Sequence, residues 1–203
     1  MIFDPSEPPL TDSAGLLKSV PVEAGPEIWK RATRVISSGL CDLQVNGFAG
    51  VDYNDPTLMP EEFEKSLFAM LSTGVTTCLP TVITGSEDWQ IQCFHALEAG
   101  RNASKLAQAM IPGYHLEGPF LNPEEGFCGC HPSKWMRPAT WDHFERLQEA
   151  AGGRITLITV APEIKGVLDL IPKLVENGIA VAIGHCNPNR DTLLRAADAG
   201  VTL

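Results

Sequence analysis

Two polar residues that follow apolar runs are the strongest candidates for chemistry. Glu117 ends the apolar stretch 111–117 and precedes a Gly-Pro pair, which predicts a strand that stops at a carboxylate. His185 directly follows a second apolar stretch, 179–184. A carboxylate and a neutral imidazole are common ligands of divalent metal ions. Because two strand ends would bring these residues together, we predict that Glu117 and His185 bind a metal ion.

Two amide residues close an earlier strand pattern at 40–46. Strand alternation directs the side chains of Gln44 and Asn46 to the same side. We expect both to line the metal or substrate pocket; the competing interpretation is that they hydrogen-bond the backbone at a strand end. His115 shares its side of the strand with Glu117, and we expect it to pack there or to orient a ligand.

The residues Cys-Gly-Cys-His at 128–131 raise the question of a structural zinc site. Their spacing is too tight for the usual pairs of zinc-binding cysteines, and no second pair lies nearby, so we do not expect one. The six cysteines are scattered, without the framework of a small secreted domain. We therefore expect reduced cysteines and a cytoplasmic protein.

Alternating strand and helix patterns must position these side chains. Apolar stretches predict strands near 40–46, 75–83, 111–117, 155–161 and 179–184, with another beginning near 201. Helical periodicity fills the gaps between them. Continuously apolar strands separated by helices indicate a parallel sheet that is covered on both sides.

The expected fold class is α/β, as an incomplete (β/α)8 TIM barrel. The first strand is not followed by Gly-x-Gly-x-x-Gly, which disfavours a dinucleotide-binding fold. Candidate active residues at the ends of several strands favour the barrel, which usually needs about 250 residues. The chain has 203 residues, with patterns for five strands and the start of a sixth. We predict a partial barrel over 36–203, and an irregular lead-in or remnant of a small β domain over 1–35.

Capping residues define several helix ends. Ser86 and Thr140 are expected N-caps, as is Asn187, which precedes a proline. Pro172 should kink or restart the helix pattern around it. His143 lies in a helix pattern, and we expect it at the surface or at the boundary of the core.

Charge and composition exclude some partners. The formal net charge is −10 and no basic run is present, so we expect no nucleic acid partner. No apolar run reaches the roughly 18 residues of a membrane span. The first residues also lack the pattern of a signal peptide. We therefore expect no membrane partner.

Together these segments resemble the N-acetylglucosamine-6-phosphate deacetylases of the amidohydrolase superfamily. The matching motifs are Gly-Leu-Cys-Asp-Leu-Gln-Val-Asn-Gly at 39–47, Thr-Gly-Val-Thr-Thr at 73–77 with Pro-Thr at 80–81, His-Leu-Glu-Gly-Pro-Phe-Leu at 115–121, Gly-Cys-His-Pro at 129–132, Ala-Pro-Glu at 161–163 and Gly-His at 184–185. Each motif is weak alone, whereas the ordered set is specific. The resemblance runs from about residue 36 to the end of the chain.

The resemblance implies one divalent metal ion, zinc or ferrous iron, bound by Glu117, His185 and a further histidine beyond Leu203. Most amidohydrolases carry His-x-His at the end of the first barrel strand, where this chain has Gln44 and Asn46. Amides bind divalent metal ions poorly compared with imidazoles, so a second metal ion is disfavoured.

The resemblance also implies a reaction. In the family, a metal-activated water hydrolyses the N-acetyl group of N-acetylglucosamine 6-phosphate, giving glucosamine 6-phosphate and acetate. The general base is an Asp that would lie beyond this chain, so no catalytic residue is expected within it. Cys130 and His131 match a loop that touches the substrate, and His131 could donate a hydrogen bond to a sugar hydroxyl or a phosphate oxygen. The family suggests a homodimer.

Two alternatives stay open. The protein could be an amidohydrolase of another N-acyl substrate, or a non-catalytic truncated homologue that lacks one metal ligand and the general base. An open barrel edge also invites pairing with another chain. We therefore expect little or no deacetylase activity from the isolated 203-residue chain.

Overall fold

A computed structural model describes residues 2–3, 34–35 and 39–203 of the chain. The chain divides into two units, Met1–Leu40 and Cys41–Leu203. In the first unit, strands β1 (Ile2–Phe3) and β2 (Arg34–Val35) pair in antiparallel fashion. The lead-in predicted over 1–35 falls mainly outside the described residues and stays a prediction.

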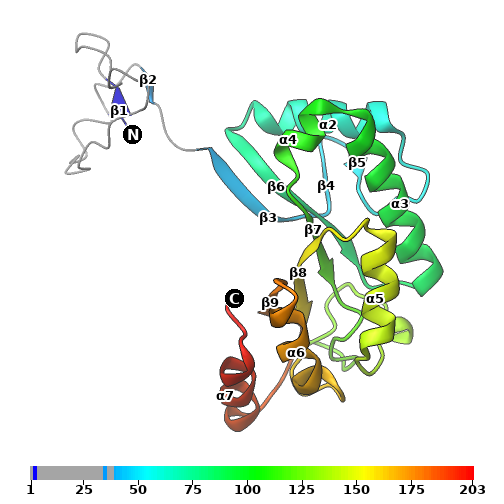
Figure 1. Ribbon diagram of the computed structural model, residues 1–203, viewed down its shortest axis with the longest axis vertical. Helices are drawn as coiled ribbons and strands as arrows, with labels where there is room; N and C mark the ends of the chain where they lie inside the picture. Colours follow the sequence, from blue (N-terminus) through cyan, green and yellow to red (C-terminus); the bar gives the residue numbers. More distant parts are fainter. Residues whose placement is uncertain (1, 4–33, 36–38) are drawn as a thin grey trace. The chain divides into compact units, whose positions relative to one another are not determined.

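One five-stranded sheet carries the predicted chemistry, and its spatial order, β3-β6-β7-β8-β9, follows the order of the chain. Its strands are β3 (Leu40–Val45), β6 (Val75–Ile83), β7 (Tyr114–Glu117), β8 (Ile155–Val160) and β9 (Ala180–Ile183). The pairs from β6 to β9 are parallel. Parallel strands in chain order with helices between them are the arrangement of a (β/α) barrel (Figure 1). The predicted incomplete barrel is confirmed.

Helices connect the strands and bury their outer side. They are α2 (Pro60–Leu71), α3 (Glu87–Ala103), α4 (Lys105–Met110), α5 (Trp141–Ala150), α6 (Val167–Glu176) and α7 (Arg190–Ala199). Shorter elements are the antiparallel pair β4 (Gly47–Phe48) and β5 (Val51–Asp52), and the single 3-10 turn η1 (Ser133–Trp135). Helices α3 and α5 lie side by side along the strands (Figure 1).

The core lies between the helices and the sheet. Its largest fully buried side chains include Tyr53, Phe63, Phe94, Tyr114, Phe120 and Phe144. The central strand β7 is buried at all four positions. Burial of apolar side chains at roughly 25 cal/mol per Å² holds this strand in place. A carboxylate at its end is therefore fixed inside the protein rather than in solvent.

The helix ends test the capping predictions. The side chains of Ser86 and Thr140 accept hydrogen bonds from the main-chain N–H groups three residues on, as predicted. The Asn187 prediction is wrong: Asn189 caps α7 instead, and its side chain accepts from Thr192 N–H. Pro172 lies inside α6, which continues through it. Pro172 is the sixth residue of α6, so the helix continues there without the main-chain N–H that another residue would donate to the Leu168 carbonyl, and the predicted restart is wrong.

His143 was expected at the surface or at the boundary of the core, and this expectation is wrong. Its relative exposure is 3%. The ring packs edge-on against Phe120, with centroids 5.6 Å apart. The burial comes from packing between segments far apart in the sequence, which helix periodicity alone does not reveal.

The edges of the sheet are only partly covered. Beyond β9, Thr202 N–H donates to Val181 O at 3.1 Å and Ile183 N–H donates to Leu203 O at 3.0 Å. The strand predicted near 201 is present only as these hydrogen bonds.

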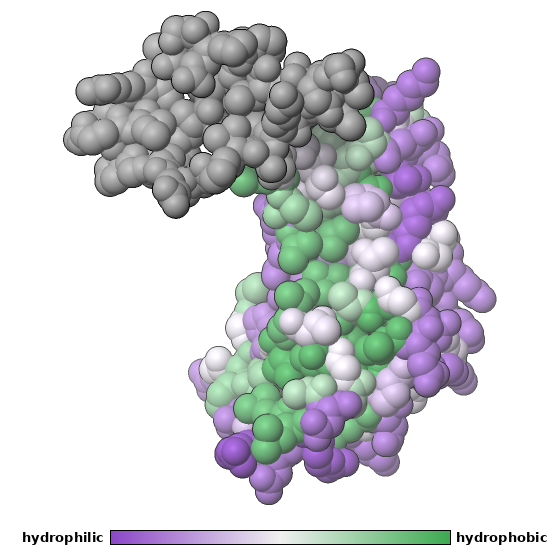
Figure 2. Space-filling view, turned by 60° about the vertical axis from the view of Figure 1, so that its left-hand side comes forward, coloured by the Kyte–Doolittle hydropathy of each residue, from purple (hydrophilic) through white to green (hydrophobic). Residues whose placement is uncertain are grey.

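Figure 2 shows apolar side chains gathered over one broad face, bordered by hydrophilic ones. In the described residues, no helix has both the length and the apolar character that crossing a bilayer demands.

Candidate metal centre

Glu117 is the last residue of β7, as predicted, and lies at the carboxyl end of the sheet. It pairs in register with Ile83 of β6 and Thr159 of β8. Gly118 follows with φ +86°, and a Cβ there would lie 2.1 Å from Thr84 Oγ1. Only glycine fits this turn without strain, and the turn aims the Glu117 carboxylate along the strand end.

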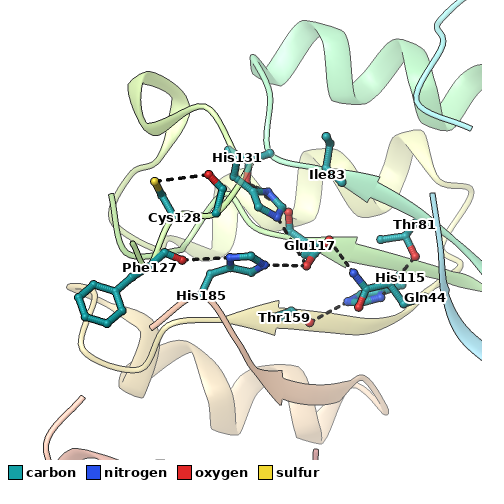
Figure 3. A network of polar contacts seen from close by, with 12 residues as sticks. Gln44, Thr81, Ile83, His115, Glu117, Phe127, Cys128, His131, Thr159 and His185 are labelled. Atoms are coloured by element: carbon teal, nitrogen blue, oxygen red, sulfur yellow. Dashed lines mark hydrogen bonds and ion pairs between the residues drawn. The ribbon is translucent and has the colours of Figure 1, made fainter. Parts of the chain in front are cut away.

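Two histidine rings meet the Glu117 carboxylate (Figure 3). His185 Nε2 lies 3.1 Å from Glu117 Oε1, and His131 Nε2 lies 3.5 Å from the same oxygen. The two rings pack edge-to-face, with centroids 4.3 Å apart. The relative exposures of Glu117 and His131 are 5% and 4%. The predicted pair, Glu117 and His185, is thus close in space, and His131 joins it.

Hydrogen bonds to the far side of each ring fix its tautomer. His185 Nδ1 lies 3.1 Å from Phe127 O, a group that can only accept, so Nδ1 carries the proton. Thr84 donates its hydroxyl proton to Glu117 O at 3.2 Å. It must therefore accept from His131 Nδ1 at 3.1 Å. In the neutral form of each ring, Nε2 is therefore the nitrogen without a proton, and it faces the Glu117 carboxylate.

The loop carrying His131 reaches the His185 ring because residue 129 is glycine. A Cβ on Gly129 would lie 2.9 Å from His185 Cε1. Its φ of +59° is also one that other residues rarely adopt. Neither the close approach nor the tautomers follow from strand patterns, which is why His131 was not predicted as part of the metal group.

The other oxygen of Glu117 is held from the opposite side. Gln44 Nε2 donates to Glu117 Oε2 at 2.9 Å. Beneath this contact, His115 Nδ1 lies 3.1 Å from Leu43 O, and its Nε2 lies 2.8 Å from Thr159 Oγ1. His115 therefore ties β3, β7 and β8 together directly below the carboxylate.

Burial and the three histidines act in opposite directions on Glu117. Burial favours the protonated acid, but the hydrogen bond that His131 donates when protonated, and the positive charges that His131, His185 and His115 then carry, outweigh it. The pKa of the Glu117 carboxyl is thereby lowered from its usual value. The pKa of His115 is also lowered, mainly because burial disfavours the imidazolium. The site thus combines an ionised carboxylate with a neutral imidazole beneath it.

The donor set fits a divalent metal ion. The three ligand atoms of Glu117, His131 and His185 lie within 4.8 Å of one another, and no other such group occurs among the residues that the structure describes. Two donors on one tetrahedral zinc ion, each bound at about 2.0–2.1 Å, would be roughly 3.3 Å apart. The distances from Glu117 Oε1 to the two histidine Nε2 atoms, 3.1 and 3.5 Å, are similar. Two lone pairs and a carboxylate that face one another are stabilised by a cation. Ring N–H groups held by a hydroxyl and a carbonyl are typical of metal-binding histidines.

The remaining predicted residues lie less centrally. Gln44 is exposed, and its side chain bonds to Glu117. Asn46 is exposed, and its main-chain carbonyl accepts from Tyr53 N–H at 3.0 Å. Cys130 is an exposed free cysteine on the loop before His131. The substrate-binding roles of these residues remain predictions.

Proteins with similar sequences indicate the class of protein to which this arrangement belongs. No protein-family model matches the chain. An N-acetylglucosamine-6-phosphate deacetylase from Bacillus subtilis is 29% identical over 185 residues, covering 87% of this chain and 44% of that protein. An N-acetylgalactosamine-6-phosphate deacetylase from Shewanella sp. is 34% identical over 178 residues, covering 86% of this chain and 42% of that protein.

Solved structures give the same result. A mutant N-acetyl-D-glucosamine-6-phosphate deacetylase from Mycobacterium smegmatis, in complex with N-acetyl-D-glucosamine-6-phosphate, matches with a TM-score of 0.72 and 28% identity, over 81% of this chain and 41% of that one. An N-acetylglucosamine-6-phosphate deacetylase from Pasteurella multocida matches with a TM-score of 0.70 and 29% identity, over 81% of this chain and 41% of that one.

The fold is that of part of an amidohydrolase barrel. Within that class, the chain is a homologue of the N-acetylglucosamine-6-phosphate deacetylases, and the resemblance drawn from its motifs is confirmed. The chain spans about two fifths of the length of the curated relatives it matches, 44% and 37% in two of them.

Proposed function

We propose that this chain forms the metal-binding part of a deacetylase that removes the N-acetyl group of N-acetylglucosamine 6-phosphate. The observation that carries the proposal is the convergence of Glu117, His131 and His185 at the carboxyl end of the sheet, in a chain homologous to such deacetylases. This is the end where (β/α) barrels carry their active sites. The products would be glucosamine 6-phosphate and acetate.

In this proposal, Glu117 and His185 hold a single divalent ion. When bound, the ion supplies Lewis-acid polarisation and lowers the pKa of a water molecule. Glu117 contributes the negative charge, and its Oε1 is directed inward because Gln44 occupies Oε2. His185 contributes a neutral Nε2, held in place by its bond to Phe127 O.

His131 presents its Nε2 at the same point. The atom can complete the donor set or accept a hydrogen bond from a substrate hydroxyl, because the proton of the neutral ring is on Nδ1. Its expected role as a donor to the substrate would require the imidazolium. Loss of metal affinity in His131→Gln would identify it as a ligand, and loss of substrate affinity alone would identify it as a substrate contact.

The galactosamine epimer is a second candidate substrate. The Shewanella relative, named for N-acetylgalactosamine 6-phosphate, is 34% identical to this chain, and a Haemophilus influenzae relative named for N-acetylglucosamine 6-phosphate is 33% identical. Both substrates share the N-acetyl group and the 6-phosphate and differ at one hydroxyl. The proposed metal chemistry is the same for both.

The test is acetate release by the protein from its native source, loaded with Zn²⁺ or Fe²⁺ and given each sugar phosphate in turn. We expect release from one of them, and none after Glu117→Gln. Metal binding without release from either, together with hydrolysis of another N-acyl compound, would support an amidohydrolase of different specificity instead.

The 203-residue chain alone is expected to show little or no turnover, because the general base would come from outside it. Robust metal-dependent deacetylation by the isolated chain would contradict this expectation. The identity of the metal, a homodimer and a cytoplasmic location stay predictions.

A further inference from the structure

The loop that carries His185 has an unusual backbone. His185 lies two residues beyond the end of β9 and has φ +50°, a left-handed conformation that non-glycine residues rarely adopt. Such a residue persists only where its surroundings hold it. The hydrogen bonds around His185 show which residues do so.

Three loops at the carboxyl end of the sheet meet at one carboxylate oxygen. Glu163, in the loop after β8, accepts from Asn122 Nδ2 at 2.9 Å and from Asn187 N–H at 2.6 Å through its Oε1. Asn122 follows β7, and Asn187 follows β9 two residues after His185. Because β8 lies between β7 and β9, Glu163 bridges the loops on either side of its own strand.

The same loops also meet directly at His185. Asn122 N–H donates to His185 O at 3.0 Å. Asn122 Oδ1 accepts from Glu124 N–H at 2.8 Å. Glu124 O in turn accepts from Phe127 N–H at 3.1 Å, and Phe127 O holds the His185 ring. The backbone and the ring of His185 thus both depend on Asn122.

We propose that Glu163 is a positioning residue for the metal centre: by clamping Asn122 and Asn187, it holds His185 in its left-handed conformation and aims Nε2 at Glu117. This inference rests on the proposed function, because it assigns a role in holding the same metal ion. Glu163 itself does not touch the three donor atoms in the contacts described. Its effect passes through the loop that carries His185.

The second oxygen of Glu163 supports a role beyond folding. Glu163 Oε2 is buried without a hydrogen-bond partner among the described residues. Burying a carboxylate oxygen in this way costs stability, so a carboxylate at this position is better explained by what its Oε1 positions than by a contribution to stability.

The experiment measures Zn²⁺ affinity of the full chain by competition with a chromogenic chelator, together with urea unfolding of the metal-free protein. Glu163→Ala should weaken Zn²⁺ binding by about 10–100-fold, the usual effect of losing a group that orients a ligand. Glu163→Gln keeps an acceptor oxygen and should recover much of that loss. Glu125→Ala removes an exposed carboxylate from the Asn122–His131 loop and should leave the affinity unchanged.

A spectroscopic readout separates positioning from general stability. In metal-free wild-type chain, the ring-nitrogen NMR shifts of His185 should report a single Nδ1–H tautomer. In Glu163→Ala they should move toward a mixture of tautomers, and in Glu125→Ala they should not move. If Glu163→Ala unfolds, Asn122→Ala replaces it and must show the same loss of affinity.

The outcomes distinguish this inference from the proposed function. Wild-type chain that binds Zn²⁺, with Glu163→Ala and Glu125→Ala binding equally well, would overturn the positioning role and leave the metal centre intact. Wild-type chain that binds no Zn²⁺ would overturn the metal centre itself, and the positioning role with it.

Discussion

Gln44 Nε2 lies 2.9 Å from Glu117 Oε2, so an amide on the first strand of the sheet occupies one oxygen of the carboxylate on the third. The other oxygen, Oε1, is the one that faces His131 and His185. An amide at this place therefore orients the acidic donor instead of binding a metal ion itself.

Replacing Gln44 tests this orientation. Gln44→Leu removes the donor while keeping a side chain of similar size, and we expect Zn²⁺ affinity to fall by about 10–100-fold. Because Gln44 is exposed, the free energy of unfolding should change by no more than about 0.5 kcal/mol. Chelator competition and urea unfolding measure the two quantities. An unchanged affinity would show that Glu117 is oriented without Gln44.

The Thr84 hydroxyl controls the His131 tautomer. Thr84→Val removes the group that donates to Glu117 O and accepts from His131 Nδ1. Since Thr84 is buried, we expect a loss of about 1–3 kcal/mol in unfolding free energy and weaker metal binding. Thr84→Ser keeps the hydroxyl and is the matched control. Equal affinities in the two variants would argue against a role of this hydroxyl in the site.

The turn after Glu117 offers a clean comparison of two glycines. Gly118 and Gly126 have φ of +86° and +92°, but a Cβ would meet Thr84 Oγ1 at 2.1 Å in the first and nothing within 4 Å in the second. Alanine at either position strains the backbone by about 1 kcal/mol or more. Only Gly118→Ala should also displace Thr84 and weaken Zn²⁺ binding. Similar metal affinities for the two variants would contradict the proposed tight fit at the strand end.

Acid should destabilise the fold through His143 and Glu87. Burial lowers the pKa of His143 from its usual 6.5. The contact with the Glu87 carboxylate opposes this shift but does not cancel it. The hydrogen bond from Arg146 lowers the pKa of Glu87 from 4.5. His143 Nδ1 lies 2.8 Å from Glu87 Oε2, while His143 Nε2 is buried without a partner and cannot take a proton there at low cost.

A group whose pKa is lowered by folding contributes stability that is present above its unfolded pKa and is lost as the pH falls through its folded pKa. We therefore expect unfolding free energy to be level above about pH 6.5, to decline below it, and to decline further below about pH 4.5. Urea unfolding of the metal-free chain at a series of pH values gives the profile. His143→Gln should reduce the first decline; an identical profile would remove His143 as its source.

The fold was largely predictable because its strands are continuous apolar stretches separated by helices. Glu117 and His185 were predictable for the same reason: each is the polar residue that ends or follows such a stretch. Ser86 and Thr140 could be assigned as caps because the capping bond spans only three residues.

The contacts that complete the site could not be predicted in this way. His131 joins Glu117 through a loop that reaches the sheet because Gly129 permits its approach to His185. Asn189, rather than Asn187, caps α7 because the helix begins only at Arg190, while Asn187 lies in the loop that bonds to Glu163. These contacts depend on how distant loops pack, and no periodic pattern encodes them.

Metal stoichiometry tests the central claim most directly. The wild-type chain and Glu117→Gln are dialysed to equilibrium against Zn²⁺, and bound metal is measured by mass spectrometry on protein of known concentration. We predict one Zn²⁺ per wild-type chain and loss of that ion in the variant, with metal-free unfolding still cooperative. Wild-type chain without bound Zn²⁺, or a variant that retains it equally, would contradict a metal centre at Glu117, His131 and His185.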